Sequence, residues 1–186
     1  MNLPIDKPIF AIDAGDTLSG FAILEAKDKL LRIPGELTFG KVSNEEILTL
    51  IKRWSGKCEF AIEFPYPKNN VVPFEVFAMT AWVGRMEQVI LDCGVKSARI
   101  FRHREKSVMC RSGSANDSQI RASVIDLLGG KGTKENPGPT FGVSADVWQA
   151  IAVGITYIVE GDSMERAKAV AKTNRGRATK KLPLPK

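Results

Sequence analysis

The sequence predicts a single mixed α/β domain followed by a basic C-terminal tail. The chain has 186 residues, of which 44% are hydrophobic and 26% charged, as in an ordinary soluble domain. It opens with two short apolar runs separated by turn residues, which is typical of a β-hairpin. Later segments alternate between short apolar runs and helical spacing, and this order favours helices that cross between strands of one sheet.

The predicted hairpin pairs residues 8–12 (PIFAI) with residues 20–24 (GFAIL). The connecting DAGDTLS consists of turn-forming residues. A third strand is expected over residues 30–37, where Pro34 and Gly35 require a bend or a sheet edge.

The remaining elements are recognised by capping residues at helix starts and by short apolar runs for strands. The first expected helix runs from Ser43, which forms a capping box with Glu46, to Trp54, and the second from Pro73 to Cys93. The third runs from the capping residues Asn116-Asp117-Ser118 to Leu128, and the fourth from the cap Ser144 to about Val159. The expected strands between them cover residues 59–63 and 96–101, with His103 as a polar strand-end residue in the basic stretch that follows.

The net charge of +6 is concentrated at the C-terminus. Residues 166–186 hold eight basic side chains and no acid, so the remaining 19 basic and 21 acidic residues leave a net of −2. We therefore divide the chain into a domain over residues 1–160 and a basic tail over residues 161–186. A basic tail on a balanced domain suggests a polyanionic partner; a solubilising terminus is the alternative.

The cysteine pattern and the hydropathy indicate a cytoplasmic protein without a membrane span. Cys58, Cys93 and Cys110 are odd in number and widely spaced, which argues against a disulfide scaffold or a cysteine-rich zinc site. The N-terminus lacks the pattern of a signal peptide. The longest mostly apolar stretch, residues 147–159, is too short to cross a bilayer.

Carboxylates follow two of the predicted strands directly. FAID ends at Asp13 and FAIE ends at Glu63, and a third acid, Asp146, is expected in the first turn of the last helix. A carboxylate at the end of a central strand is costly to bury unless it is paired or binds a metal, and hard divalent cations prefer oxygen ligands. The alternatives are an Asx turn at Asp13, an exposed strand end at Glu63 and dipole complementation at Asp146.

Asp13, Gly15 and Gly20 form a D-x-G-x-x-x-x-G pattern on the predicted hairpin. Gly15 permits the turn and Gly20 leaves space on the returning strand. Both RNase H-like nucleases and actin-like ATPases begin in this manner, but the two lobes of the ATPases need a much longer chain. The nuclease interpretation is favoured.

Several segments in order resemble the RuvC-type Holliday junction resolvases, particularly their phage-encoded branch. The resemblance covers most of residues 9–157 and rests on the segments AIDAGDTLSG, AIEFPYPKN, GSANDSQIRASVIDLL and SADVWQAIAVGITY. It implies an RNase H-like fold with a mixed five-stranded sheet flanked by helices. It also implies that Asp13, Glu63 and Asp146 are catalytic and bind two Mg²⁺ ions, for which Mn²⁺ can substitute.

One position departs from the family pattern. The second aspartate of the last helix is replaced by Gln149, which offers only a neutral carbonyl oxygen. Asp117 is the nearest acid that could compensate, as a further catalytic residue, although its place before a helix favours N-capping.

The resemblance also implies a four-way or branched DNA substrate, a two-fold dimer through the helix over residues 73–93, and the cytoplasm of a bacterial host if the protein is phage-encoded. Tyr66 lies where the family carries an aromatic wedge at the branch point. The candidate phosphate contacts, each with surface solvation as the alternative, are Lys68, Arg99, Arg102, Arg104, Lys106 and Arg111.

The expected function is therefore metal-dependent hydrolysis of phosphodiesters in branched DNA. Two alternatives remain open at this stage: a less selective RNase H-fold nuclease acting on flaps or RNA, and a junction-binding protein whose site is weakened by Gln149.

Overall fold

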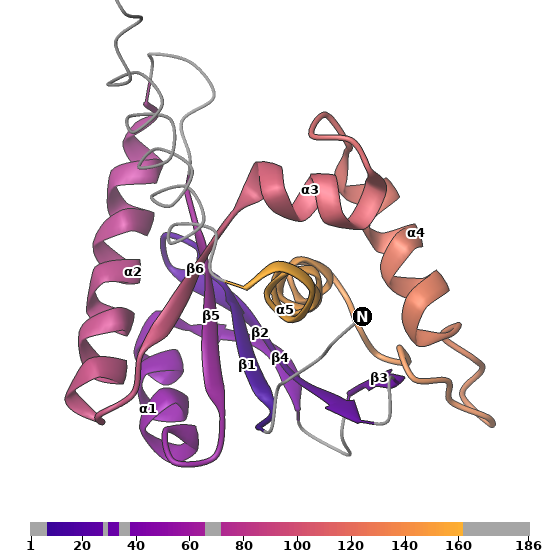
Figure 1. Ribbon diagram of the computed structural model, residues 1–186, viewed down its shortest axis with the longest axis horizontal. Helices are drawn as coiled ribbons and strands as arrows, with labels where there is room; N and C mark the ends of the chain where they lie inside the picture. Colours follow the sequence, from indigo (N-terminus) through magenta and orange to yellow (C-terminus); the bar gives the residue numbers. More distant parts are fainter. Residues whose placement is uncertain (1–6, 28–29, 34–37, 66–71, 162–186) are drawn as a thin grey trace, which may run out of the picture.

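The structure, a computed structural model, describes residues 7–27, 30–33, 38–65 and 72–161. Its strands are β1 (Ile9–Asp13), β2 (Leu18–Lys27), β3 (Leu30–Arg32), β4 (Phe39–Ser43), β5 (Glu59–Phe64) and β6 (Ser97–Phe101). Its helices are α1 (Asn44–Trp54), α2 (Phe74–Asp92), α3 (Arg102–Cys110), α4 (Asp117–Leu128) and α5 (Val147–Glu160). The sheet lies between two helical layers, with α1 and α2 on one face and α3, α4 and α5 on the other (Figure 1).

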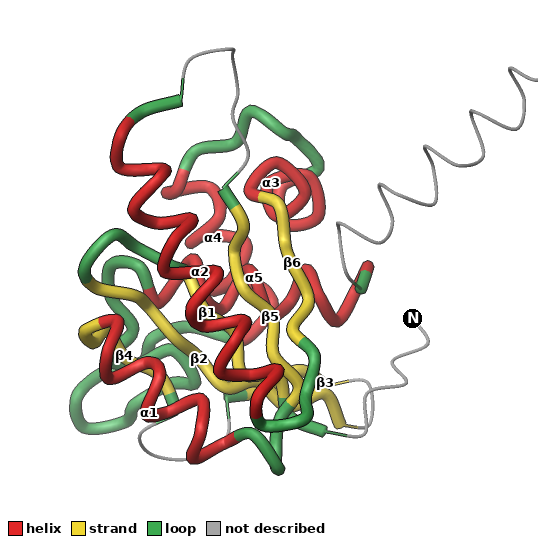
Figure 2. The backbone as a smooth tube through the Cα atoms, turned by 90° about the vertical axis from the view of Figure 1, so that its left-hand side faces the viewer, coloured by secondary structure: helices red, strands yellow, loops and turns green. Residues whose placement is uncertain are grey.

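The sheet is mixed, as expected from the sequence. β1 pairs antiparallel with β2 and parallel with β5, which in turn pairs parallel with β6. β3 and β4 both pair with β2, at its C-terminal and N-terminal ends respectively, so the order β3-β2-β1-β5-β6 is five strands wide. Figure 2 looks onto the face covered by α1 and α2, with β5 and β6 side by side.

Alternation along the central strand divides the apolar residues between two cores. Ile9 and Ala11 face α5, whereas Phe10 and Ile12 face α1 and α2. All four side chains are at most 1% exposed, because both faces of the strand are covered. Asp13, the last residue of this strand, lies where the strand leaves the core and is partly exposed.

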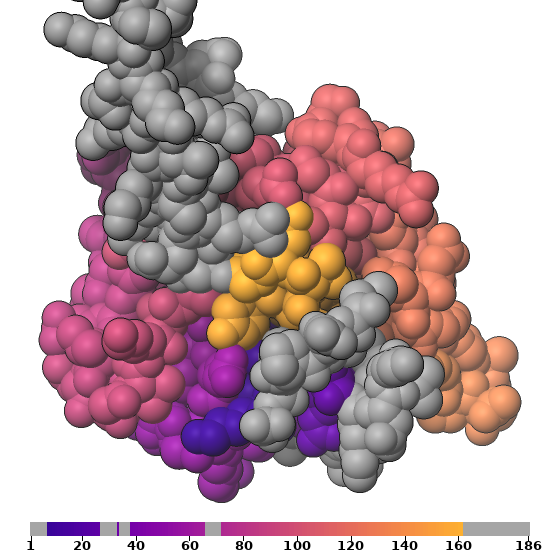
Figure 3. All heavy atoms as spheres, in the orientation of Figure 1, coloured from indigo at the N-terminus to yellow at the C-terminus, as the bar shows by residue number. Residues whose placement is uncertain are grey.

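Helix α5 is enclosed between the sheet and helices α3 and α4. Every residue from Val147 to Thr156 is buried, and the helix reaches the surface at its C-terminal end, where Val159 is 44% exposed (Figure 3). Gly154 permits this close packing, since a Cβ atom there would lie 2.1 Å from Leu24 Cδ1 and 3.0 Å from Ala11 Cβ.

Two elements were not predicted from the sequence. β4 was missed, and the predicted third strand over residues 30–37 is observed only as β3; residues 34–37 lie outside the described residues. Helix α3 occupies the basic stretch, so the prediction of His103 as a strand-end residue is wrong. The buried residues of α3 are Glu105 and Met109, and a buried glutamate hides the apolar periodicity that identifies a helix.

Of two predicted helix caps, one is wrong and one is confirmed. Ser144 does not cap the last helix, because Ala145 takes a left-handed φ of 43° and the helix begins at Val147 with Asp146 in the N-cap position. By contrast, Ser43 caps α1 as predicted, with its Oγ accepting from the Glu46 N–H at 3.2 Å.

Candidate active site

Asp13 and Glu63 lie at the ends of adjacent parallel strands. Ile12 of β1 is opposite Ile62 of β5, so the next residue of each strand projects from the same edge of the sheet. Asp13 is partly exposed there, and the Glu63 side chain is 12% exposed. The structure therefore brings together the two strand-end acids that the sequence singled out.

The turn after Asp13 is held by a buried polar network that sequence reasoning missed. The Gly15 N–H donates to Ser19 Oγ at 3.2 Å, and the Ser19 hydroxyl donates to Asn44 Oδ1 at 2.6 Å. Asn44 Nδ2 donates back to the Gly15 carbonyl at 3.2 Å. Because Ser19 and Asn44 are fully buried, breaking one of these bonds leaves a desolvated polar group unpaired. The network fixes the hairpin turn, and with it Asp13, against the start of α1.

Gly20 allows the start of α5 to approach Asp13. It is paired with Asp13 across the hairpin, and a Cβ atom at Gly20 would lie 2.7 Å from the Asp146 carbonyl oxygen. The Asp146 side chain makes no capping bond; it pairs instead with Lys41 of β4, with Oδ2 2.6 Å from Nζ. Both side chains are about 40% exposed, so this is a surface ion pair that contributes little stability.

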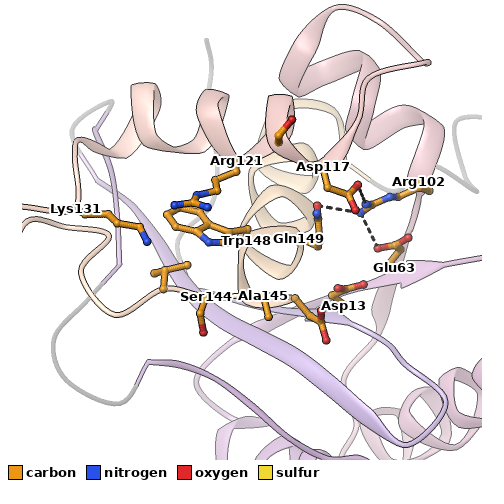
Figure 4. A pocket seen from close by; sticks show the side chains of 13 residues that line it. Asp13, Glu63, Arg102, Asp117, Arg121, Lys131, Ser144, Ala145, Trp148 and Gln149 are labelled. Atoms are coloured by element: carbon orange, nitrogen blue, oxygen red, sulfur yellow. Dashed lines mark hydrogen bonds and ion pairs between the residues drawn. The ribbon is translucent and has the colours of Figure 1, made fainter.

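Arg102 occupies the centre of the acidic cluster (Figure 4). Its Nη1 donates to Glu105 Oε1 at 3.0 Å, to Gln149 Oε1 at 3.1 Å and to Glu63 Oε2 at 3.4 Å. Its Nη2 donates to Asp117 Oδ1 at 2.7 Å. One guanidinium therefore joins side chains from β5, α3, α4 and α5.

The prediction that Asp117 caps α4 is wrong. Asn116 is the N-cap: its side chain accepts from the Gln119 N–H at 3.0 Å, and Gln119 Oε1 accepts from the Asn116 N–H at 2.9 Å. Asp117 is thereby free to turn toward the cavity, where it pairs with Arg102.

Two carboxyl groups in this cluster have perturbed pKa values. Burial, reinforced by the neighbouring Glu63, raises the pKa of Asp13 well above its usual range. Burial and Glu63 also raise the pKa of Glu105, although Arg102 opposes the shift. Burial lowers the pKa of Arg102, but the surrounding acids outweigh it and raise the pKa overall, so the guanidinium stays charged. Arg102 thus offsets the mutual repulsion of these carboxyl groups only in part.

The donor chemistry fits one divalent cation at the Asp13 end of the cluster. Asp13 forms no ion pair with any described residue, and it lies beside a second carboxylate, Glu63. Oxygen ligands of this kind suit Mg²⁺ and Mn²⁺. Across the described ranges, however, no three acidic, histidine or cysteine side chains are gathered closely enough to hold a metal. Two of the acids have cationic partners instead: Glu63 pairs with Arg102 and Asp146 with Lys41.

The acids line one part of a cavity of about 700 Å³, whose other part is basic. There, Arg121 and Lys131 lie near the buried ring of Trp148, with charged atoms 5.3 and 5.4 Å from its centroid (Figure 4). Ser118 and Ser144 also line the cavity. Sequence reasoning missed this basic part, because its residues come from α4, the loop after α4 and α5.

The remaining predicted DNA contacts lie away from the cavity or outside the described residues. Arg104 is bound by Glu160 at the end of α5, and Arg99 donates to Glu87 at 2.6 and 2.7 Å. Lys106 lies on α3, and Arg111 is its exposed C-cap. Tyr66, Lys68 and the tail over residues 162–186 are not among the described residues, so their predicted roles stay predictions.

Comparison with solved structures decides the fold. RuvC of Thermus thermophilus matches with a TM-score of 0.60 at 17% identity, covering 81% of this chain and 92% of RuvC. The fold is that of RuvC. A second structure, RuvC of T. thermophilus in complex with a Holliday junction substrate, matches this chain with a TM-score of 0.59 at 18% identity and with the same coverage. The RNase H-like fold predicted from the sequence, a mixed sheet flanked by helices, is thus confirmed.

No protein-family model and no curated protein matches the sequence. Within the described ranges, no helix combines the length and apolar character needed to span a bilayer.

Proposed function

We propose that this protein is an endonuclease that resolves Holliday junctions or other branched DNA by metal-dependent phosphodiester hydrolysis. The observation that carries the proposal is the pair of carboxylates, Asp13 and Glu63, side by side in a cavity of the RuvC fold. The basic part of the same cavity adds complementarity to a phosphate backbone. The RuvC structure with a Holliday junction bound supports branched DNA as the substrate class.

Asp13, Glu63 and Asp146 are the proposed ligands of Mg²⁺, for which Mn²⁺ can substitute. When bound, the cation supplies an activated water and offsets charge on the phosphate. Asp13 and Glu63 hold it from the rigid edge of the sheet. Asp146 joins them by exchanging its exposed partner Lys41, which costs little because surface ion pairs are weak. Lys41 is then available to the phosphate.

Arg121 and Lys131 position the DNA strand in this proposal. Their charges lie in the same cavity as the acids, so a strand bound along it places one phosphate at the basic part and another at the acids. The nearby Trp148 ring favours cations over its face, which helps to hold both side chains in place. The basic tail over residues 161–186 is proposed to add non-specific attraction to DNA.

We also propose a homodimer formed through α2, which would present two sites to a two-fold junction. Phe74 and Phe77 support this proposal, because they are 80% and 61% exposed on a helix that buries Val83, Met86 and Ile90. Large exposed aromatic side chains on one helix are typical of an interaction surface.

The test is cleavage of a labelled four-way junction in Mg²⁺ or Mn²⁺, compared with a linear duplex of the same sequence. We expect the junction to be cut and the duplex to be spared. Asp13→Asn is expected to reduce cleavage by more than the roughly 10–100-fold that loss of an outer-shell partner costs, while junction binding persists. Cleavage of flaps or RNA in preference to junctions would instead identify a less selective nuclease.

The second candidate is a junction-binding protein with a weakened site. The position of Arg102, which pairs with acids that a metal would otherwise use, favours this alternative. It predicts tight junction binding with no cleavage in either metal, and no effect of Asp13→Asn on binding.

A further inference from the structure

The acidic cluster contains its own cation. Arg102 begins α3, and its guanidinium is 24% exposed between Glu63, Glu105 and the helices α4 and α5. The contacts of 2.7–3.4 Å with four side chains use both terminal nitrogens. A cation with oxygen partners on several sides occupies the same electrostatic position as a metal ion in a carboxylate site.

A neutral glutamine at position 149 is the suitable partner for the Arg102 guanidinium. Its amide oxygen accepts a hydrogen bond from Arg102 at 3.1 Å, and the residue is only 9% exposed. A singly charged guanidinium that already faces Glu63, Glu105 and Asp117 does not need a further carboxylate, and a buried surplus charge would be costly. The neutral amide supplies the acceptor without that charge.

Arg102 is anchored in this position by Glu105. The Glu105 side chain is fully buried and accepts from Arg102 at 3.0 and 3.1 Å through its two oxygens. If Arg102 swung out to admit a metal, a fully buried carboxylate would lose its partner. The guanidinium is therefore a fixed part of the site, unlike Lys41, whose pairing with Asp146 is exposed.

We propose that Arg102 replaces the second metal ion, so that the site binds a single divalent cation at Asp13, Glu63 and Asp146. The inference rests on the proposed nuclease function and revises the two ions expected from the sequence to one. In this proposal Arg102, Gln149 and Asp117 keep their positions with or without metal. The single metal ion binds and leaves at Asp13, Glu63 and Asp146.

The test counts Mn²⁺ bound per chain, by electron paramagnetic resonance of the free ion at saturating Mn²⁺. We expect one ion for the wild-type chain and one for Arg102→Lys, which keeps the positive charge. The double variant Arg102→Met with Gln149→Asp removes the cation and restores an acid, so we expect it to bind two ions.

Two further variants keep the test decisive if the double variant does not fold, as checked by circular dichroism. Gln149→Asp alone is expected to bind one ion, because Arg102 still fills the second position. Arg104→Met, which breaks the ion pair of the same helix with Glu160, is the matched control and is also expected to bind one ion.

The outcomes separate the inference from the proposed function. Two ions bound by the wild-type chain or by Gln149→Asp would overturn the role of Arg102 and leave the nuclease proposal standing. No Mn²⁺ bound by the folded wild-type chain would overturn both. A folded double variant that binds a single ion would also contradict the inference.

Discussion

At Asp13 a carboxyl group lies in a partly buried position beside Glu63 and forms no ion pair with a described residue. Such a position is costly for the carboxylate in the metal-free protein, because burial and the neighbouring Glu63 both disfavour its charged form. In the proposed metal-bound state, a cation beside Asp13 would offset this cost. Stability and metal binding are therefore linked at this residue.

Asp13→Asn is accordingly expected to stabilise the protein in EDTA. The amide has the same shape and no charge, so we expect the melting temperature to rise by about 2–4 °C, equivalent to about 1 kcal/mol for a chain of this size. Saturating Mg²⁺ should raise the melting temperature of the wild-type chain and not that of the variant. Asp16→Asn, in the exposed part of the same turn, is the control and should change neither value.

Arg121 and Lys131 are expected to contribute to DNA affinity without contributing to stability. Each removal to alanine should weaken junction binding at all sequences and reduce the slope of log affinity against log salt by about one. Fluorescence anisotropy over a salt series measures both quantities. Lys52→Ala, on the exposed side of α1 and so on the opposite face of the sheet, is the matched control. An unchanged salt slope for both cavity variants would exclude these residues as phosphate contacts.

Cys58 gives the protein a pH dependence at alkaline values. Burial raises the pKa of its thiol to about 11, from an ordinary value of 9.0. Because the folded state holds this proton more tightly than the unfolded state, stability falls as the pH rises from about 9 to 11. The loss at pH 10 is about 1 kcal/mol, and urea unfolding at pH 8 and 10 measures it. Cys58→Ala, which removes the buried thiol, should show a smaller fall than the wild-type chain.

Among the elements, α5 packs closely against the sheet at Gly154. Gly154→Ala places a methyl group 2.1 Å from Leu24 Cδ1, so helix and sheet must separate or Leu24 must change rotamer. We expect a loss of about 1–3 kcal/mol in urea unfolding. Gly84→Ala in α2 is the control: nothing lies within 4 Å of the new Cβ, and helix propensity predicts a gain of about 1 kcal/mol. Equal stability of the two variants would contradict the close packing of α5.

The elements also differ in how well the sequence predicts them. Asp13 and Glu63 directly follow short, continuous apolar runs, so their positions at strand ends could be predicted. α3 could not, since its inward-facing residue Glu105 is charged and its pairing depends on a guanidinium one turn earlier. Likewise, the position of Arg102 depends on four elements meeting in space, and no local pattern encodes such a meeting.

For the whole molecule, the proposed dimer depends on the exposed face of α2. Phe77→Glu places a charge on the proposed dimer surface, where it would be desolvated on association, so we expect a dimer-to-monomer shift in sedimentation velocity. Leu127→Glu, which alters an exposed apolar residue of α4 instead, should leave the sedimentation coefficient unchanged. A wild-type chain that sediments as a monomer at all concentrations would contradict the proposed dimer.

Because α5 is enclosed and comes late in the chain, the two apolar cores can form in sequence during synthesis. The apolar core under α1 and α2 uses residues no later in the chain than Val95, whereas the core on the other face is centred on α5. During synthesis one side of the sheet can therefore close while the other still lacks its central helix. Asp146 and Gln149 arrive with that helix, so the ribosome-bound chain holds Asp13 and Glu63 without the residues that complete their surroundings. The cavity, which α4 and α5 line together, can therefore form only after α5 has left the exit tunnel and docked.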